Sequence, residues 1–227
     1  MVDYEFELKR PDRTIRRHEW RGIVRVVESL VPIGASTTWL DFGCGNGGLV
    51  RYCQRQGLKG AIGCEEGSIG RAAEEAGIPL LRMTELKTRE GAFDVVTAIE
   101  VLEHVENPLT VLTQVRALLK RGGLFFYTTG NAQPFRHNLL EWRYVVPEIH
   151  ISYFEPETLR QALVRTGFKP EFRAAIPGFD DIIQFKILKN LGVRQNAWWQ
   201  RLTPWRILTR LADVRYHISS HPIGWAT

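Results

Sequence analysis

The chain of 227 residues has no run of about 18 apolar residues, which excludes a transmembrane helix. Its N-terminal residues are largely charged and lack the apolar core of a signal peptide. It has only three cysteines, which cannot all pair and which match no zinc-binding spacing. We therefore expect a reduced, cytoplasmic protein without a disulfide framework.

A long basic run is also absent, although the formal net charge is +5. The mild positive excess permits an anionic substrate or a membrane surface, and the missing basic run disfavours a nucleic acid as the partner. No internal repeat or low-complexity segment is present. The length suits one sizeable domain, or one domain with an appendage.

One segment combines a short apolar strand, an acid and a glycine-rich loop: residues 39–48 read WLDFGCGNGG. Glycine tolerates positive φ and has no side chain, so a ligand can lie against the backbone of this loop. The helix that should follow aims its free N–H groups at the same ligand. The loop predicts a nucleotide-like cofactor at the carboxyl edge of a parallel sheet, and the alternative is a tight turn without a ligand.

The glycine spacing alone leaves the cofactor open. Gly43, Gly45 and Gly48 match the G-x-G-x-x-G pattern of dinucleotide-binding proteins, so a nicotinamide-dependent oxidoreductase is one alternative. Asp41 favours another ligand, because a carboxylate there would crowd a pyrophosphate but suits a cation. S-adenosylmethionine (SAM) carries an ammonium and a sulfonium and has no phosphate, so it fits better.

At these residues the chain resembles the class I SAM-dependent methyltransferases. DFGCGNG over 41–47 is similar to their first motif, and AIGCE over 61–65 to their second, a strand that ends in the acid for the ribose hydroxyls. The pattern departs after the third strand, where no aspartate stands to bind adenine and a methionine is expected on the ring instead. The resemblance implies these cofactor-binding residues: Asp41, Gly43, Cys44, Gly45, Gly47, Glu65, Met83 and Ile99.

Segments of strand length alternate with helical patterns along most of the chain. The expected strands are 37–42, 59–64, 79–83, 93–98, 124–129 and 169–175. The expected helices are 15–31, 48–56, 68–76, 107–120 and 156–167. With the resemblance, this alternation predicts an α/β fold, a doubly wound, mostly parallel, seven-stranded sheet of the Rossmann-like methyltransferase type. Residues 1–175 would form the SAM-binding core.

Residues 176–227 break the alternation and predict a helical cap or insertion followed by the last strand. Two helices are expected, at 179–191 and 197–211, and the strand at 216–219 or 223–226. The second helix interleaves tryptophans with arginines: Trp198, Trp199, Arg201, Trp205, Arg206 and Arg210. Such a helix can lie on a membrane surface as a peripheral contact, but an aromatic stripe more often packs in a core, which favours the cap.

A cluster of titratable residues follows the strand at 93–98, where the carboxyl edge should face the transferred group. Glu100, Glu103 and His104 are spaced i, i+3 and i+4, so one helical turn would place them on a shared face. Two carboxylates beside an imidazole are a candidate metal-ligand set. The long segment 130–147 is a candidate substrate lid.

This cluster resembles two groups of methyltransferases. DVVTAIEVLEHV over 94–105 is similar to the ubiquinone-pathway O-methyltransferases, and Glu-x-x-Glu-His is similar to the motif of the small-RNA 2′-O-methyltransferases. In the RNA group a further histidine completes a divalent-metal site, and His150 is its candidate here. The resemblance implies that Mg²⁺ or another divalent metal is held by the following residues: Glu100, Glu103, His104 and His150. The metal-free alternative uses His104 or His150 as a general base.

Together the sequence and its resemblances predict an enzyme, a SAM-dependent methyltransferase that acts on a hydroxyl of a small-molecule acceptor. A sugar, a secondary-metabolite intermediate or a quinone-type intermediate would supply that hydroxyl. An N or C acceptor stays open, because the fold hosts many reactions. The remaining alternative is a SAM-binding protein without catalysis.

Overall fold

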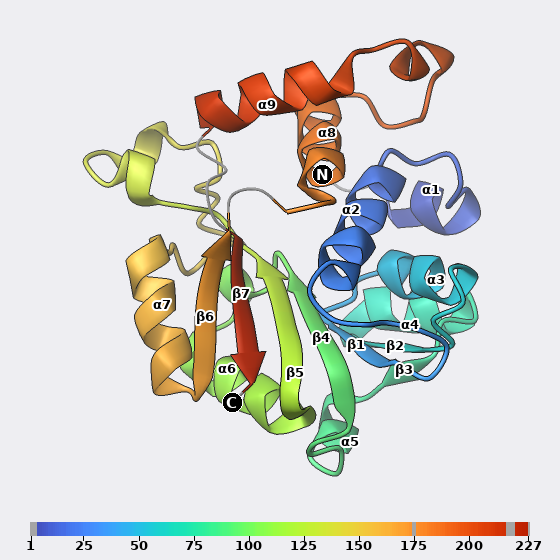
Figure 1. Cartoon of the computed structure of the whole chain (residues 1–227), viewed down its shortest axis with the longest axis vertical. Helices are drawn as coiled ribbons and strands as arrows, with labels where there is room; N and C mark the ends of the chain where they lie inside the picture. Colours follow the sequence, from blue (N-terminus) through green and yellow to red (C-terminus); the bar gives the residue numbers. More distant parts are fainter. Residues whose placement is uncertain (1–3, 174–175, 217–220, 227) are drawn as a thin grey trace.

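The structure is a computed structural model and describes residues 4–173, 176–216 and 221–226. Its strands form one sheet in the order β3-β2-β1-β4-β5-β7-β6 (Figure 1). They are β1 (Thr38–Phe42), β2 (Gly60–Cys64), β3 (Leu80–Leu81), β4 (Phe93–Ile99), β5 (Leu119–Thr128), β6 (Phe168–Arg173) and β7 (His221–Ala226). Parallel pairing joins β3, β2, β1, β4 and β5, whereas β7 runs antiparallel to its neighbours β5 and β6. The predicted Rossmann-like, mostly parallel sheet is confirmed.

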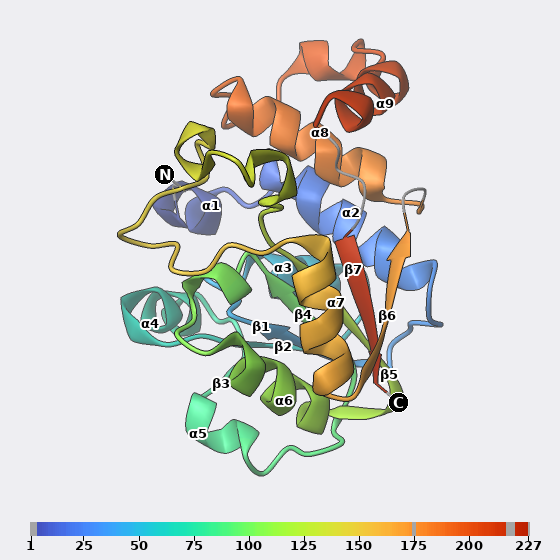
Figure 2. The same ribbon diagram turned by 90° about the vertical axis from the view of Figure 1, so that its left-hand side faces the viewer.

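Helices cover both faces of the sheet, as a parallel sheet requires (Figure 2). They are α1 (Tyr4–Lys9), α2 (Arg16–Glu28), α3 (Gly48–Arg55), α4 (Gly67–Glu75), α5 (Met83–Leu86), α6 (Pro108–Leu118), α7 (Pro156–Arg165), α8 (Phe179–Asn190) and α9 (Trp205–Tyr216). Short 3₁₀ turns are η1 (Leu102–His104), η2 (Gln133–Phe135), η3 (Leu139–Glu141) and η4 (Trp198–Arg201). None of the described helices is long and apolar enough to cross a membrane.

Alternating side chains along the strands bury two separate apolar clusters. Trp39 in β1 and Val95 in β4 belong to the cluster that also contains side chains of α2, α3 and α8. Their neighbours Leu40 and Val96 belong to the cluster with α6 and α7. Both faces of the central strands are therefore closed to ligands, and a ligand must approach the strand ends. The order of strands reverses between β1 and β4, which is where ligands bind in open α/β sheets.

Some elements differ from the expectation. The third strand is shorter than predicted because α5 already begins at Met83. The predicted tail helix 197–211 is split: α9 begins at Trp205, and the two preceding tryptophans lie in η4. Pro204 explains the break, because proline disfavours helical backbone in the residue before it. The last strand, β7, agrees with the second of the two predicted positions, whereas most of 216–219 lies outside the described residues.

The helix α8, which follows β6 in the chain, packs closely against α2. A Cβ at Gly22 in α2 would lie 2.6 Å from the carbonyl oxygen of Gly178, the residue before α8. Gly178 itself has a φ of +100°, which favours glycine. Arg21 and Arg25 of α2 donate hydrogen bonds to the Asp181 carboxylate in α8, at 2.6 and 2.9 Å. These contacts place α8 above the carboxyl ends of the strands, with α9 outside it (Figures 1 and 2).

Replacing Gly22 with valine should destabilise the fold, because the new side chain collides with the backbone of Gly178. Overpacking of this kind costs about 1–3 kcal/mol, which lowers the Tm of a domain of this size by several degrees. Thermal unfolding followed by circular dichroism measures the effect. Gly34→Val is the control, since no atom lies within 4 Å of the Cβ position at Gly34. Equal Tm values for the two variants would contradict the packing described for α2 and α8.

Candidate active site

The glycine loop after β1 adopts a backbone that glycine takes more easily than other residues. Gly43, Gly45 and Gly47 have φ angles of +71°, +55° and +72°. The loop folds against β2, since the N–H groups of Gly43 and Cys44 both donate to the carbonyl oxygen of Cys64. α3 begins directly after the loop. The predicted strand, loop and helix are therefore present at the carboxyl edge of the sheet.

Asp41 is buried beneath the loop, with only 4% of the residue exposed. Its carboxylate accepts a hydrogen bond of 2.7 Å from Oγ1 of Thr97 in β4. Burial raises the pKa of Asp41 to about 7. The Thr97 hydroxyl also accepts a hydrogen bond of 3.1 Å from Nε1 of Trp39, and this bond orients the hydroxyl toward Asp41. The Asp41 side chain, from β1, is thus held against β4. Its attraction for a cationic ligand stays a prediction.

Glu65, the predicted ribose ligand, already contacts the glycine loop. Its Oε2 accepts a hydrogen bond of 2.8 Å from the N–H of Gly45, and its Oε1 accepts one of 3.0 Å from the N–H of Glu66. The side chain is half-buried at the end of β2. Each carboxylate oxygen has a second lone pair, so the same carboxylate can accept from ligand hydroxyls while it holds the loop.

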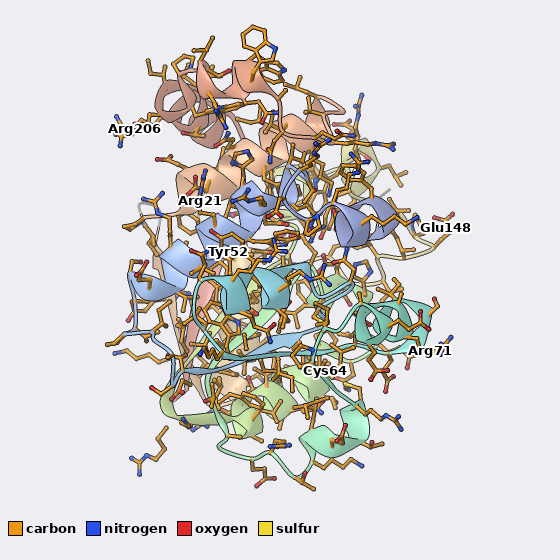
Figure 3. The ribbon with its side chains drawn as sticks, turned by 90° about the vertical axis from the view of Figure 1, so that its right-hand side faces the viewer. Arg21, Tyr52, Cys64, Arg71, Glu148 and Arg206 are labelled. Carbon is orange, nitrogen blue, oxygen red and sulfur yellow. The ribbon has the colours of Figure 1, made fainter. Side chains whose placement is uncertain are left out.

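The other predicted cofactor residues also lie at this edge. Cys44 is buried, and burial raises the pKa of its thiol far above the usual range, so Cys44 packs rather than reacts. The Met83 thioether lies 3.3 Å from Sγ of Cys64, at the first turn of α5. Ile99 is half-buried as the last residue of β4. Figure 3 shows Cys64 inside the molecule, at the end of β2. Contacts of these residues with a ligand stay predictions.

The segment after β4 is not the helical turn that the i, i+3, i+4 spacing predicted. Glu100 has a φ of +54° and is the one non-glycine residue with positive φ in the described part of the chain. A short 3₁₀ turn, η1, then carries Glu103 and His104. Positive φ in a residue other than glycine costs free energy, and such residues cluster at functional sites. The expectation of one shared helical face is therefore wrong, and the side chains are brought together in another way.

Three of the four predicted metal ligands meet. Glu103, His104 and His150 each offer one ligand atom, and these atoms all lie within 4.8 Å of one another. Glu103 is buried, and its Oε2 accepts a hydrogen bond of 2.8 Å from Thr129 at the end of β5. Its backbone carbonyl accepts from the N–H groups of residues 151 and 152, which holds the His150 segment against η1.

Hydrogen bonds fix the proton on each of the two imidazoles. Nδ1 of His104 lies 2.7 Å from the carbonyl oxygen of Ile149, and Nδ1 of His150 lies 2.5 Å from that of Tyr144. A carbonyl oxygen can only accept, so each Nδ1 carries a hydrogen and each neutral ring keeps a lone pair on Nε2. The centroids of the His104 and His150 rings lie 4.8 Å apart. The cluster therefore contains two nitrogen lone pairs and a carboxylate.

Glu100 does not join this cluster. Lys186 of α8 lies 3.6 Å from its carboxylate, and the hydroxyls of Thr128 and Tyr144 both donate to it at 2.9 Å. Burial acts to raise the pKa of Glu100, but the Lys186 ammonium and these hydrogen bonds outweigh it and lower the pKa. Burial and the nearby charge of Glu100 raise the pKa of Glu103. Sequence reasoning missed Lys186, which belongs to no motif and comes from the far end of the chain.

Tyr144 joins the long segment after β5 to both carboxylates. Its hydroxyl contacts Glu103 as well as Glu100. Its ring stacks on His150 at 4.2 Å and on Trp142 at 4.7 Å, and Trp142 stacks in turn on Phe135 at 5.3 Å. Through this aromatic stack, the segment that was predicted as a lid forms one side of the site. A long loop predicts a function in general terms, but its sequence does not show which ring reaches the strand ends.

A second contact that the sequence did not indicate comes from α1. The Glu7 carboxylate accepts a hydrogen bond of 2.9 Å from Nδ2 of Asn46 in the glycine loop, and both side chains are buried. Oδ1 of Asn46 accepts from the N–H of Gly48 at 3.1 Å. The short helix α1 therefore supports the loop from outside the sheet.

A family model described as a methyltransferase domain matches residues 13–171, more than half of the chain. The chain belongs to this methyltransferase family. The matched region contains the glycine loop, Glu65 and the cluster of Glu103, His104 and His150. The family supports SAM as the cofactor and agrees with the predicted class I methyltransferase.

The curated relatives include ubiquinone biosynthesis O-methyltransferases. The protein of Sodalis glossinidius is 36% identical over 104 residues, which cover 42% of this chain and 42% of the relative. The protein of Cereibacter sphaeroides is 34% identical over 148 residues, which cover 58% of this chain and 60% of the relative. The match therefore spans less than two-thirds of the length of either relative.

Solved methyltransferases share the fold over the whole chain. A SAM-dependent methyltransferase from Archaeoglobus fulgidus has a TM-score of 0.59 at 18% identity, covering 99% of this chain and 100% of that one. A Haloferax volcanii methyltransferase in complex with the Trm112 activator has a TM-score of 0.61 at 17% identity, covering 100% of this chain and 98% of that one. At these identities the likeness shows the fold alone.

Replacing Glu65 with alanine should weaken SAM binding about tenfold or more, because each hydrogen bond to a charged group is worth about 1.5–3 kcal/mol. Isothermal titration calorimetry with SAM measures the affinity. Glu66→Ala is the matched control, because it removes the same charge from the next, exposed residue. Unchanged affinity in Glu65→Ala, or equal losses in the two variants, would show that Glu65 does not hold the cofactor.

Proposed function

We propose that the chain transfers the methyl group of SAM to a hydroxyl of a small-molecule acceptor. The observation that carries this proposal is the meeting of the Glu103 carboxylate with the His104 and His150 rings. Glu103 and His104 follow β4, the strand that pairs with β1 across the reversal of strand order, and the segment that contains His150 is hydrogen-bonded to Glu103. The glycine loop follows β1, so a donor held on that loop would face the cluster.

The chain's own residues supply the groups for such a transfer. The acceptor oxygen attacks the methyl carbon in line with the sulfur, so a C–O bond forms as the C–S bond breaks and the sulfonium becomes a thioether. Without a bound cation, Nε2 of His104 or His150 takes the hydroxyl proton, since each has a lone pair there. Asp41, Glu65 and the glycine loop hold and orient the donor, because alignment supplies much of the acceleration in such a reaction.

The donor set also fits a divalent cation. Imidazole nitrogens with a carboxylate are ligands that Mn²⁺, Fe²⁺ and Zn²⁺ accept, and each imidazole donates its other N–H to a carbonyl, as metal-ligating histidines usually do. Glu103, His104 and His150 would hold the cation, and when bound it would lower the pKa of the acceptor hydroxyl. Glu100 pairs with Lys186, so we leave it out of the proposed ligand set.

A metal-free reaction is the second candidate, because the same neutral Nε2 atoms can accept the proton without a cation.

The acceptor that the cluster favours is one with neighbouring hydroxyls, such as a sugar, a secondary-metabolite intermediate or a quinone-type intermediate. The names of the ubiquinone biosynthesis relatives support the last of these. The alternatives are transfer to nitrogen or carbon, and SAM binding without catalysis.

Removing the general base, by His104→Ala or by His150→Ala, should lower methyl transfer about a hundredfold or more, since a positioned general base contributes that much. Transfer from methyl-labelled SAM to a set of catechols and hydroxybenzoates measures the rate, and calorimetry should give an unchanged affinity for SAM. His137→Ala is the matched control, because His137 is an exposed histidine of the same segment. Full activity in both variants would refute the site.

A titration with Mn²⁺, followed by electron paramagnetic resonance of the free ion, separates the two mechanisms. The metal-assisted reaction requires a site that His104→Ala and His150→Ala abolish and that His137→Ala retains. Wild-type protein that transfers methyl groups in the presence of EDTA and binds no Mn²⁺ would establish the metal-free alternative.

A further inference from the structure

The segment between α8 and the middle of α9 has an unusual composition. Residues 191–211 contain four arginines and three tryptophans but neither aspartate nor glutamate, in a chain with 25 acidic residues. The segment and α9 form a layer outside α8, away from the sheet (Figures 1 and 2). A concentrated positive charge therefore lies in one outer layer of the molecule.

Two side chains fix which face of α9 is turned inward. Thr209 is fully buried, and its Oγ1 donates a hydrogen bond of 3.0 Å to the Asp180 carboxylate of α8. Nε1 of Trp205 donates a hydrogen bond of 2.6 Å to the carbonyl oxygen of Gln200. These two residues are spaced i and i+4, so they define one inner stripe of the helix.

The opposite stripe of α9 is apolar and exposed. Ile207 and Leu211 are 61% and 63% exposed, and their positions, two residues after those of the inner stripe, lie about 200° around the helix. Arg206 and Arg210 form an exposed row beside this apolar stripe. Figure 3 shows Arg206 projecting outward from α9. An outward apolar stripe beside arginines is typical of helices that lie in a membrane interface.

The neighbouring turn η4 extends the same composition. Trp198 is 75% exposed, which is high for a side chain that usually buries most of its surface. Arg201 of the same turn is also exposed. Among the described residues, Arg201, Arg206 and Arg210 have no carboxylate partner. Their charges are therefore available to an anionic surface.

We propose that this face docks on an anionic lipid bilayer. It is defined by Trp198, Arg201, Arg206, Ile207, Arg210 and Leu211, and we call it the basic–apolar face. The apolar side chains would enter the headgroup region while the arginines contact lipid phosphates. A second copy of the chain fits less well, because a two-fold interface would bring like charges together and the segment has no acidic residue to offset them.

Co-sedimentation with vesicles tests this surface without reference to the reaction. Wild-type protein should bind phosphatidylcholine vesicles that contain phosphatidylglycerol and bind phosphatidylcholine alone at least tenfold more weakly. The triple variant Arg201→Gln, Arg206→Gln, Arg210→Gln should lose at least tenfold in binding to the anionic vesicles, since each arginine near such a surface contributes roughly fivefold. High salt should have the same effect.

Matched variants separate docking from general charge. Arg89→Gln, Arg121→Gln, Arg165→Gln removes the same charge from exposed positions after α5, in β5 and at the end of α7, and should bind like the wild type. Trp198→Ser, Ile207→Ser should lose quenching of tryptophan fluorescence by brominated lipid. Circular dichroism checks that each variant is folded.

Three results would overturn the proposal. One is a wild-type protein that stays in the supernatant with anionic vesicles. The second is an equal loss of binding in the two triple variants, which would show that net charge alone matters. The third is a stable dimer in light scattering that Trp198→Ser, Ile207→Ser converts to a monomer, which would make the face an interface between copies.

Discussion

Parallel pairing of the central strands is the constraint on which the site depends. β1 pairs with β2 and β4, and β4 pairs with β5, all in the same direction. The residues that follow these strands therefore meet at one edge, which explains how Glu65, Glu100 and Thr129 come together from distant parts of the sequence. Buried side chains on both faces of β1 and β4 prevent a ligand from approaching elsewhere.

Contacts from outside the sheet then shape this edge. The Tyr144 hydroxyl lies against two carboxylates, and its ring continues into the stack that holds the segment after β5. From the other side, α8 brings the Lys186 ammonium to Glu100. That pair offsets the charge of one carboxylate, which leaves Glu103 with the histidines as the chemically available group. The packing of Gly22 against Gly178 keeps α8 near enough for this contact.

Short sequence motifs predicted those parts of the site that are built from residues close together in the sequence. The glycine loop and Glu65 could be predicted because positive φ and strand ends leave a short-range signature in the sequence. Spacing failed at Glu100, because positive φ there interrupts the expected helical turn. Lys186 could not be predicted, since its partner is set by the packing of α8 on α2. Pro204 causes the break before α9, so Trp198 lies in η4 and not in the predicted helix.

The most direct measurement of the central claim is the distance between the donor methyl group and the histidine cluster. SAM labelled with ¹³C in its methyl group can be observed by NMR on the protein, with Mn²⁺ or with diamagnetic Mg²⁺ present. The account predicts strong broadening of the bound methyl signal by Mn²⁺, which His150→Ala removes. Binding of both SAM and Mn²⁺ without such broadening would contradict it, because donor and cluster would then occupy separate places.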